Sequence, residues 1–395
     1  MNPSAPGWIN KFGHLANQGI ASYPDFQGLY QALKTKGFVY GVHLGVPSFI
    51  EAEHSLSEDE IAKINLLTAL YFTYGQKRGK TEFPEFVKTV FAYYRSLDVG
   101  RISFLGKILS GSKTESQLEK LIDSRIYPGG NVFSRAFGNS LTNSLLYMDV
   151  LIFMVYLEDS SKVKAHAQLL EYFTINIAYH SLRSKKNHDR DAKLIQILES
   201  SLTFVDQGES KIDGSYLELL GNNFTTFEKD YFLDIACLTI WEDQKFDQGE
   251  SEYIFELGKA LGKSVEEVEL ELGHVKLFLE RNREKISYLS EKHLAVQFYE
   301  GMSKNVSKLI LRNSKRLKKE LAQSRELVAL LSKSAVKELS PKEKKKVQAQ
   351  LLEIFKTIPS LAIFLLPGGA VLLPIFIKLI PKLLPSSFDD NRVEE

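Results

Sequence analysis

The chain has 395 residues, of which 44% are hydrophobic and 25% charged, and its net charge is +1. This length is enough for two or three globular domains, and the charge balance favours no particular partner. The single cysteine, Cys237, excludes a disulfide framework and indicates a buried thiol in a reducing compartment. The N-terminal sequence MNPSAPGWINKF has no secretory-signal pattern, so we expect the bulk of the chain to stay in the cytoplasm.

Helical periodicity dominates the first half of the chain. In SEDEIAKINLLTALYFTYGQ (57–76), Ser57 and Glu60 have the spacing of a capping box, and PEFVKTVFAYYRSL (84–97) continues the pattern. SLLYMDVLIFMVYLED (144–159) is apolar almost all round, which predicts a buried helix, and amphipathic helices are expected over 165–184 and 191–205. The best candidate for a strand is GFVYGVHLGV (37–46). The sequence therefore predicts an all-α fold, with a multi-helix body of helical hairpins.

Two buried helices resemble each other in sequence. YMDVLIFMVYLED (147–159) and FLDIACLTIWED (232–243) each place an aspartate early, Asp149 and Asp234, and end in an acidic pair. LLTALYFTYGQKRGKTEFPEF (66–86) is a more degenerate candidate copy. The pattern indicates either an internal repeat or helical hairpins of similar composition.

The acidic region over 228–285 has a more specific pattern. A buried helix ends in an acidic pair, a polar turn and a second helix follow, and Ser264 and Glu267 cap a third. The region resembles the tellurite-resistance TerB-like helical module, and some such modules bind divalent metal through acidic residues of this turn. That resemblance makes Asp243, Asp247 and Glu250 candidate metal ligands, with a solvated helix cap as the alternative. The turn does not follow the EF-hand pattern.

Residue patterns for catalysis are missing from the sequence. The eight histidines form no HExxH motif, and no GxSxG, P-loop or GxGxxG motif occurs. A thiol inside the apolar run LDIACLTIW is inert. We therefore expect a protein that is not an enzyme and has no cofactor.

Residues 301–350 form a basic block with fourteen Lys and Arg against four Glu, whereas residues 201–260 are acidic. Apolar residues at 306, 310, 317, 321, 328 and 331 predict one long basic amphipathic helix over 291–340. Its cations can pack on the body, face anionic lipid or contact RNA phosphates. No aromatic residues are interleaved with the charges, so base stacking is not indicated, and no DNA partner is expected.

The C-terminal segment is the most apolar part of the chain. Ser340, Pro341 and Glu343 predict a helix start, and a run of twenty residues without charge extends over 358–377. This run is long enough to cross a bilayer, as a kinked span or a re-entrant hairpin, and the alternative is burial within the protein. The candidate membrane residues are Ile358, Pro359, Phe364, Pro367, Gly368, Gly369, Pro374, Phe376, Lys378, Pro381 and Pro385.

Residues 339–388 resemble the signature region of the LETM family, the leucine-zipper, EF-hand-containing transmembrane proteins, and their bacterial relatives. The shared features are a basic start, the spacing from Phe355 to Pro359 and the ending LLPIFIKLIPKLLPSSF. Together with the TerB-like region, the architecture is similar to bacterial LETM-related, biofilm-associated proteins. The resemblance implies membrane association, ion homeostasis, ribosome binding and a homo-oligomer. Ala370 and Val371 stand where the family has an acidic residue, which disfavours cation exchange.

These observations predict five segments: an N-terminal segment (1–50), a helical domain (51–205), a TerB-like module (206–290), a basic helix (291–340) and a LETM-like segment with an acidic tail (341–395). The favoured interpretation is a non-enzymatic scaffolding or envelope-homeostasis protein. Its C-terminal segment binds lipid of the cytoplasmic membrane, with residues 1–340 in the cytoplasm. The alternatives are a cation/proton transporter of LETM type and a soluble stress- or metal-responsive protein.

Overall fold

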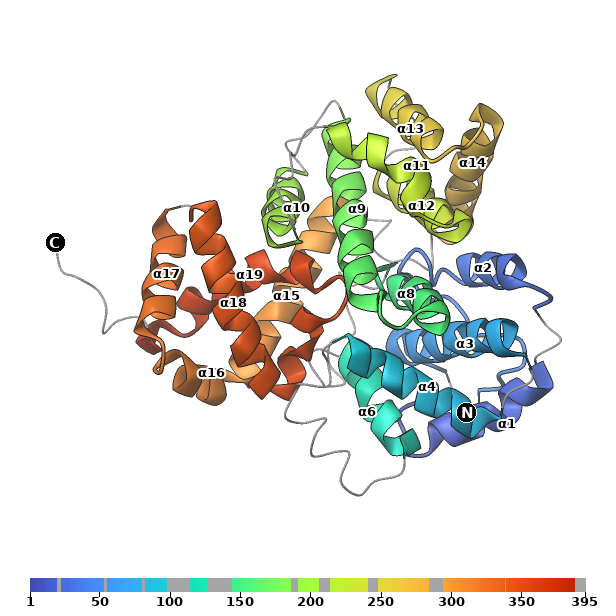
Figure 1. Ribbon diagram of the computed structural model, residues 1–395, viewed down its shortest axis with the longest axis horizontal. Coiled ribbons are helices and arrows are strands. Elements are labelled where there is room, and N and C mark those ends of the chain that lie inside the picture. The colour runs from blue at the N-terminus through green and yellow to red at the C-terminus, as the bar shows by residue number, and fades with distance from the viewer. Residues whose placement is uncertain are drawn as a thin grey trace.

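Helices make up the regular structure of the chain (Figure 1). The computed structural model describes residues 1–19, 23–52, 55–79, 82–97, 114–126, 144–185, 191–205, 214–240, 248–283, 294–337 and 339–387. No β-strand forms within these ranges. The all-α prediction is therefore confirmed for the described part of the chain.

The body of the molecule is built around α9 (Val163–Arg183), a long helix near its centre. α9 packs on α8 (Leu146–Glu158), α10 (Ala192–Val205) and α12 (Thr226–Ile240). The N-terminal helices around α8 are α1 (Trp8–Gly19), α2 (Phe26–Thr35), α3 (Glu58–Arg78), α4 (Phe83–Ser96) and α6 (Thr114–Ile126). Those around α12 are η4 (Gly214–Leu219), α11 (Leu220–Asn223), α13 (Gln248–Ala260) and α14 (Val265–Arg281).

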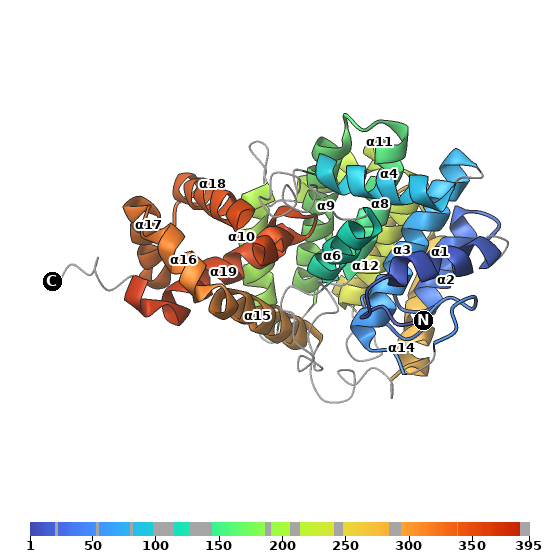
Figure 2. The same cartoon turned by 90° about the horizontal axis from the view of Figure 1, so that it is seen from below.

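A C-terminal lobe lies beside this body in both views (Figures 1 and 2). It consists of α10 together with α15 (Leu294–Arg312), α16 (Ser314–Leu321), α17 (Arg325–Val336), α18 (Pro341–Thr357), η6 (Pro359–Leu365), α19 (Gly369–Leu383) and η7 (Pro385–Ser387). α19 is its central element and packs against α10, α15 and α17. The most apolar stretch of the sequence thus lies within this lobe, in η6, the turn after it and the first part of α19.

Reciprocal capping boxes start three of the predicted helices. In each, a serine side chain accepts the backbone N–H of the third helical residue, and a glutamate at that residue accepts the serine N–H. The pairs are Ser57 with Glu60, Ser264 with Glu267, and Ser340 with Glu343. Each satisfies N–H groups that the helix leaves open and contributes about 1 kcal/mol. The capping prediction at all three sites is confirmed.

The predicted strand over 37–46 is wrong. Gly37 and Gly41 have positive φ angles of 81° and 71°, and the chain between them curls into tight turns, with the N–H of Tyr40 donating to the Gly37 carbonyl. Phe38, Val39 and Tyr40 are all buried, so the alternation of a half-exposed strand is absent. The apolar residues alone predict a strand, whereas the positive φ angles of the two glycines allow a compact buried loop.

The single long helix predicted over 291–340 is also wrong, because the chain bends twice and forms α15, α16 and α17. The first bend lies at Asn313, and at the second the Ser324 side chain caps α17 by accepting the Leu327 N–H. The predicted apolar stripe is nevertheless buried in full. The bends fold this stripe around α18 and α19 instead of extending it along one line.

The run over 358–377 does not form one continuous kinked helix. η6 ends at Leu365, Gly368 takes a left-handed conformation with φ 84°, and α19 begins at Gly369. Most of this segment is buried against the rest of the lobe. In the part of the chain that the structure describes, no helix has both the length and the apolar character that crossing a membrane needs.

Gly369 makes the first testable site. A Cβ atom there would lie 2.7 Å from the Ile363 carbonyl oxygen and from the backbone of Phe364, where no flexible side chain can move aside. We expect Gly369→Ala to lower the free energy of unfolding by about 1–3 kcal/mol, measured by denaturant titration. Gly273→Ala is the matched control, because that helical glycine faces open space and alanine should stabilise α14 by about 0.5–1 kcal/mol. Equal effects of the two changes would contradict this account.

Candidate functional site

Three phenylalanine rings hold the C-terminal elements of the lobe together. Phe355 of α18, Phe364 of η6 and Phe376 of α19 have ring centroids 4.5–5.1 Å apart. All three side chains are buried. Aromatic pairs of this kind contribute about 0.5–1.5 kcal/mol beyond the area that they bury. The LETM-like sequence motif therefore forms a packed unit with its own aromatic centre.

Two polar side chains from the body contact the turn that leads into α19. Arg125 of α6 donates from Nη2 to the Pro367 carbonyl at 3.0 Å. Glu171 of α9 accepts the N–H of Ala370 at 3.0 Å. α19 has no side-chain cap from its own N-cap residue, so Glu171 satisfies the Ala370 N–H, while the Gly369 N–H donates to the Leu366 carbonyl at 2.8 Å. We call these contacts the turn contacts.

A buried ion pair holds Arg125 in place. Its Nε and Nη2 donate to the two carboxylate oxygens of Asp149 at 2.8 and 2.9 Å, and both side chains are almost completely buried. Tyr94 donates to the same carboxylate at 2.8 Å, and Tyr93 donates to the backbone carbonyl of Asp149 at 2.8 Å. The bidentate geometry fixes the plane of the guanidinium and directs Nη2 toward Pro367.

The electrostatics of these groups differ. Burial raises the pKa of Glu171 to about 7, although the Ala370 and Gly368 N–H groups and the Arg125 charge all oppose the shift. Burial also opposes the charge on Arg125, but Asp149 outweighs it and holds the pKa of the guanidinium above its usual value. Burial raises the pKa of Tyr93 and Tyr94 well above 10. Among Arg125, Glu171 and these two tyrosines, only Glu171 is poised to titrate near neutral pH.

The predicted membrane residues occupy different environments. Buried ones are Ile358, Phe364, Pro367, Gly368, Gly369, Pro374 and Phe376. Pro381 is half-buried, Lys378 and Pro385 are exposed, and Pro359 begins η6. Sequence reasoning missed Arg125 and Glu171, which lie 242 and 199 positions before the backbone groups that they contact. Asp149 carried the one usable signal, a carboxylate within an otherwise apolar helix.

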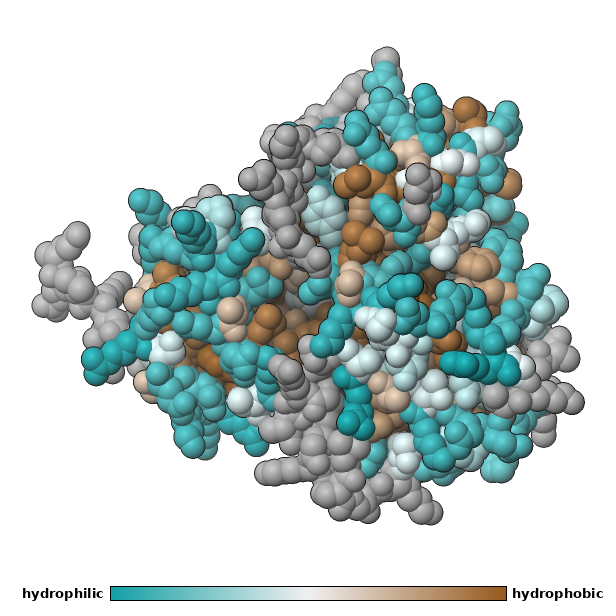
Figure 3. All heavy atoms as spheres, in the orientation of Figure 1, coloured by the Kyte–Doolittle hydropathy of each residue, from teal (hydrophilic) through white to brown (hydrophobic). Residues whose placement is uncertain are grey.

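The outer face of the lobe is basic. On α16, Lys315, Arg316 and Lys319 are exposed, while Leu317 and Leu321 anchor the helix in the core. Lys342 and Lys345 are exposed at the start of α18. On the face drawn in Figure 3, hydrophilic side chains cover most of the lobe. Lys333 and Lys346 are instead neutralised by ion pairs with Glu343 and Glu326.

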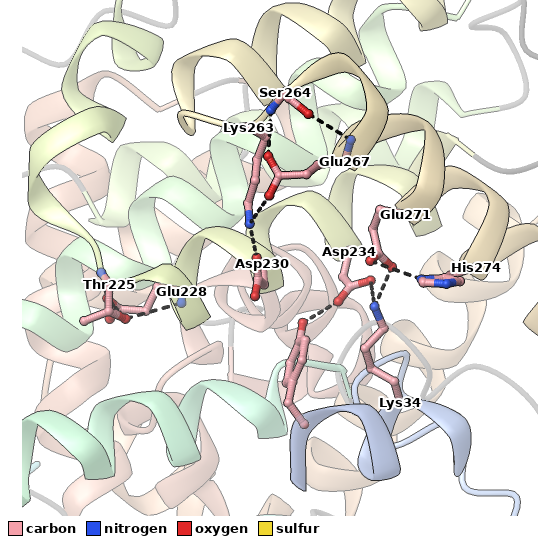
Figure 4. A network of polar contacts seen from close by, with 11 residues as sticks. Lys34, Thr225, Glu228, Asp230, Asp234, Lys263, Ser264, Glu267, Glu271 and His274 are labelled. Atoms are coloured by element: carbon pink, nitrogen blue, oxygen red, sulfur yellow. Dashed lines mark hydrogen bonds and ion pairs between the residues drawn. The ribbon is translucent and has the colours of Figure 1, made fainter. Parts of the chain in front are cut away.

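The acidic region is joined to α2 by a second buried network (Figure 4). Lys34 of α2 lies 3.0 Å from Asp234 of α12 and pairs with Glu271 of α14. Lys263 pairs with Asp230 at 2.5 Å and lies 3.8 Å from Glu267. Burial raises the pKa of Asp234. Burial opposes the charge on Lys34, but its two partners, Asp234 and Glu271, hold the pKa of the ammonium above its usual value. These contacts cross-link α2, α12 and α14.

The two aspartates of the suspected repeat have corresponding surroundings. Asp149 pairs with Arg125 and accepts a hydrogen bond from Tyr94, and Asp234 pairs with Lys34 and accepts one from Tyr30. Both carboxylates are fully buried. This similarity is one of residue environment, and the repeat itself stays a prediction.

The candidate metal ligands cannot be placed in the same way. Asp243 and Asp247 lie outside the described residues, and Glu250 lies in α13 without a described side chain. Within the described ranges, no group of three or more His, Cys, Asp or Glu side chains could hold a metal ion. The metal site stays a prediction from sequence.

The ion pair between Arg125 and Asp149 makes a second testable site. Asp149→Asn removes the charge that compensates a buried guanidinium, and we expect the free energy of unfolding to fall by about 3–5 kcal/mol in denaturant titrations. Glu158→Gln, on the same helix as Asp149, is the control. It breaks an exposed pair with Lys77 of α3 and should change stability by less than about 1 kcal/mol. A loss below about 1 kcal/mol for Asp149→Asn would show that the pair is not a structural anchor.

Comparison with known proteins places one part of the chain in a family context. No curated protein and no solved structure matches the sequence. Residues 339–395 match the family described as LETM1-like, RBD, the LETM1 ribosome-binding domain. The match begins one residue before the Ser340 cap and includes the phenylalanine cluster and the turn into α19. The C-terminal region of the chain is therefore LETM-like.

Proposed function

We propose that the protein is a non-enzymatic, ribosome-associated scaffold that docks through the basic outer face of its C-terminal lobe. The observation that carries the proposal is the match of residues 339–395 to the LETM1-like ribosome-binding family. The body, including the region that resembles a TerB-like module, acts in this proposal as a rigid partner-binding platform. Its buried ion pairs support rigidity rather than chemistry.

The chemistry of the lobe suits ribosomal RNA. α16 buries two leucines and has four exposed cations, so its charges are presented by a fixed backbone and not by a loop. Lys342 and Lys345 extend the basic character to the start of α18, which lies within the matched residues. Such cations bind phosphates by displacing counterions, without reading sequence.

We expect the triple change Lys315→Glu, Arg316→Glu and Lys319→Glu to weaken ribosome binding by at least about tenfold. Each lost phosphate contact should also lower the slope of log affinity against log salt by about one. Co-sedimentation with purified ribosomes at several KCl concentrations measures both quantities. Because the three side chains are exposed, the variant should keep the native melting temperature.

The matched control reverses three exposed cations of the body, Lys11, Lys88 and Lys162, and so changes the net charge equally. This control should bind ribosomes with nearly native affinity. Equal losses in the two variants would show that binding follows net charge alone. No binding by the native protein at low salt would exclude the proposal.

A second candidate function is association with the cytoplasmic membrane, with residues 1–340 on the cytoplasmic side. The observation that favours it is the uncharged run over 358–377, followed on α19 by the exposed Lys378 and Lys382. In the structure most apolar side chains of this run are buried within the C-terminal lobe. Contact with lipid therefore begins with the exposed Lys378 and Lys382. Insertion of the run itself requires α19 and η6 to leave the phenylalanine cluster.

Flotation with lipid vesicles tests this candidate. The full chain should float with vesicles that contain about a third anionic lipid and stay at the bottom with neutral ones, because each cation near an anionic surface contributes about 1 kcal/mol. High salt should reverse purely electrostatic binding and leave an inserted segment attached. A chain that floats with neither vesicle type contradicts membrane association.

A further inference from the structure

The outer side of α14 carries two exposed leucines. Val268, Val275 and Leu279 are buried against the body and fix the orientation of this helix. Leu270 and Leu277 lie seven positions apart, which is two helical turns, on the side opposite these buried residues. They are 60% and 43% exposed. A single exposed leucine is ordinary, but two in one row of a fixed helix form an apolar patch that suits a partner.

Gly273 lies between the two leucines in the same row. A Cβ atom there would meet nothing within 4 Å, so the surface is notched at this point. Glycine inside a helix lowers its stability, and it allows a side chain of another molecule to approach the backbone closely. We call Leu270, Gly273 and Leu277 the leucine face. Its shape suits one apolar side chain that is seated between two others.

The charges beside the leucine face are mainly negative along its first half. Three exposed anions lie there: Glu266, Glu267 and Glu269. The exposed cations, Lys276 and Arg281, lie in the second half, where Glu280 is 4.0 Å from Lys276. A complementary partner is therefore a helix that presents an apolar side chain together with cations.

The end of α15 has a surface of this kind. Leu311 is 52% exposed, and Lys304, Lys308 and Arg312 lie within two turns of it. Burial and the charge of Lys304 lower the pKa of Lys308, so the two ammonium groups repel each other and an anionic partner would relieve the repulsion. We call these four residues the basic end of α15. It lies beside α16 in the C-terminal lobe, whereas α14 lies at the outer edge of the body (Figures 1 and 2).

We propose that copies of this chain associate head to tail, with the leucine face of α14 in one copy seated on the basic end of α15 in the next. Leu311 covers Gly273, and the lysines lie beside the glutamates in the first half of α14. The contact joins two different surfaces, so association can continue beyond a dimer. This inference goes beyond ribosome binding, because the cations of α16 assigned to ribosomal RNA are not needed for it.

The size of the two surfaces sets the expected strength of the contact. Together they hold three exposed leucines, whereas stable interfaces bury about 1,200–2,000 Å² in total. We therefore expect a weak association, with a Kd between about 1 μM and 1 mM. Because the charges are exposed, the association should weaken as salt is added.

Sedimentation velocity of the full chain, without ribosomes or lipid, tests the proposal. At low salt the average mass should rise with protein concentration above the 44.8 kDa of one chain, and KCl should reverse the rise. The paired change Leu270→Ser and Leu277→Ser should abolish the rise, and so should Leu311→Ser with Lys304→Glu. These side chains are exposed, so both variants should keep the native melting temperature. A native chain that stays monomeric up to about 1 mM would overturn the proposal.

A mixture of the two variants distinguishes head-to-tail association from a symmetric contact. Each variant keeps the surface that the other has lost, so an equimolar mixture should form pairs of twice the monomer mass and nothing larger. A mixture that stays monomeric would overturn the proposal. Loss of association in the α14 variant alone would do so as well, because it would indicate a symmetric contact of α14 with α14.

Leu219→Ser is the matched control. Leu219 is a leucine of η4 that is 54% exposed and belongs to neither surface, so this variant should associate like the native chain. An equal loss in the control would show that association follows general surface hydrophobicity, and it would overturn the assignment to α14 and α15. The assay contains no ribosomes, so a failure of the proposed ribosome binding leaves its outcome unchanged.

Discussion

The buried ion pair between Arg125 and Asp149 is the constraint on which the contact between the body and the C-terminal lobe depends. A guanidinium taken out of water requires a bidentate partner, and the same partner fixes the direction of its remaining N–H groups. One of these reaches the Pro367 carbonyl, so the position of α19 is set by a residue of α6 and a residue of α8. Glu171 adds a second contact, since it accepts the Ala370 N–H in the first turn of α19.

Local signals made the helices and their starts predictable. Serine–glutamate spacings identified three capping boxes, and the apolar stripe at 306–331 correctly identified buried side chains. Long-range geometry was not predictable in this way. The spacing of the apolar stripe does not indicate the bends at Asn313 and Ser324. The run of uncharged residues over 358–377 is equally compatible with a membrane helix and with buried helices of the lobe. In the sequence, Glu171 is one of the polar residues of an ordinary amphipathic helix. Its role cannot be predicted from the sequence, because its partner is a backbone N–H 199 residues away.

The C-terminal lobe carries two chemistries on opposite sides of its helices. Cations of α16 and α18 point outward, and the apolar residues of α18, η6 and α19 point inward to the phenylalanine cluster. Phosphate binding uses the outer side and leaves the fold unchanged. Lipid insertion uses the inner side and requires the lobe to open. The two proposed functions therefore place different demands on the packing of the lobe.

Arg125 and Glu171 lie far along the chain from the turn that they contact, and this separation has a consequence for biosynthesis. Residues of α6, α8 and α9 leave the ribosome about two hundred residues before the backbone groups that they hold. The N-terminal domain can fold first, as nascent chains generally do, and present a finished receptor to the most apolar stretch as soon as it emerges. The order of synthesis thus shortens the time for which that stretch is open to aggregation or to capture by chaperones.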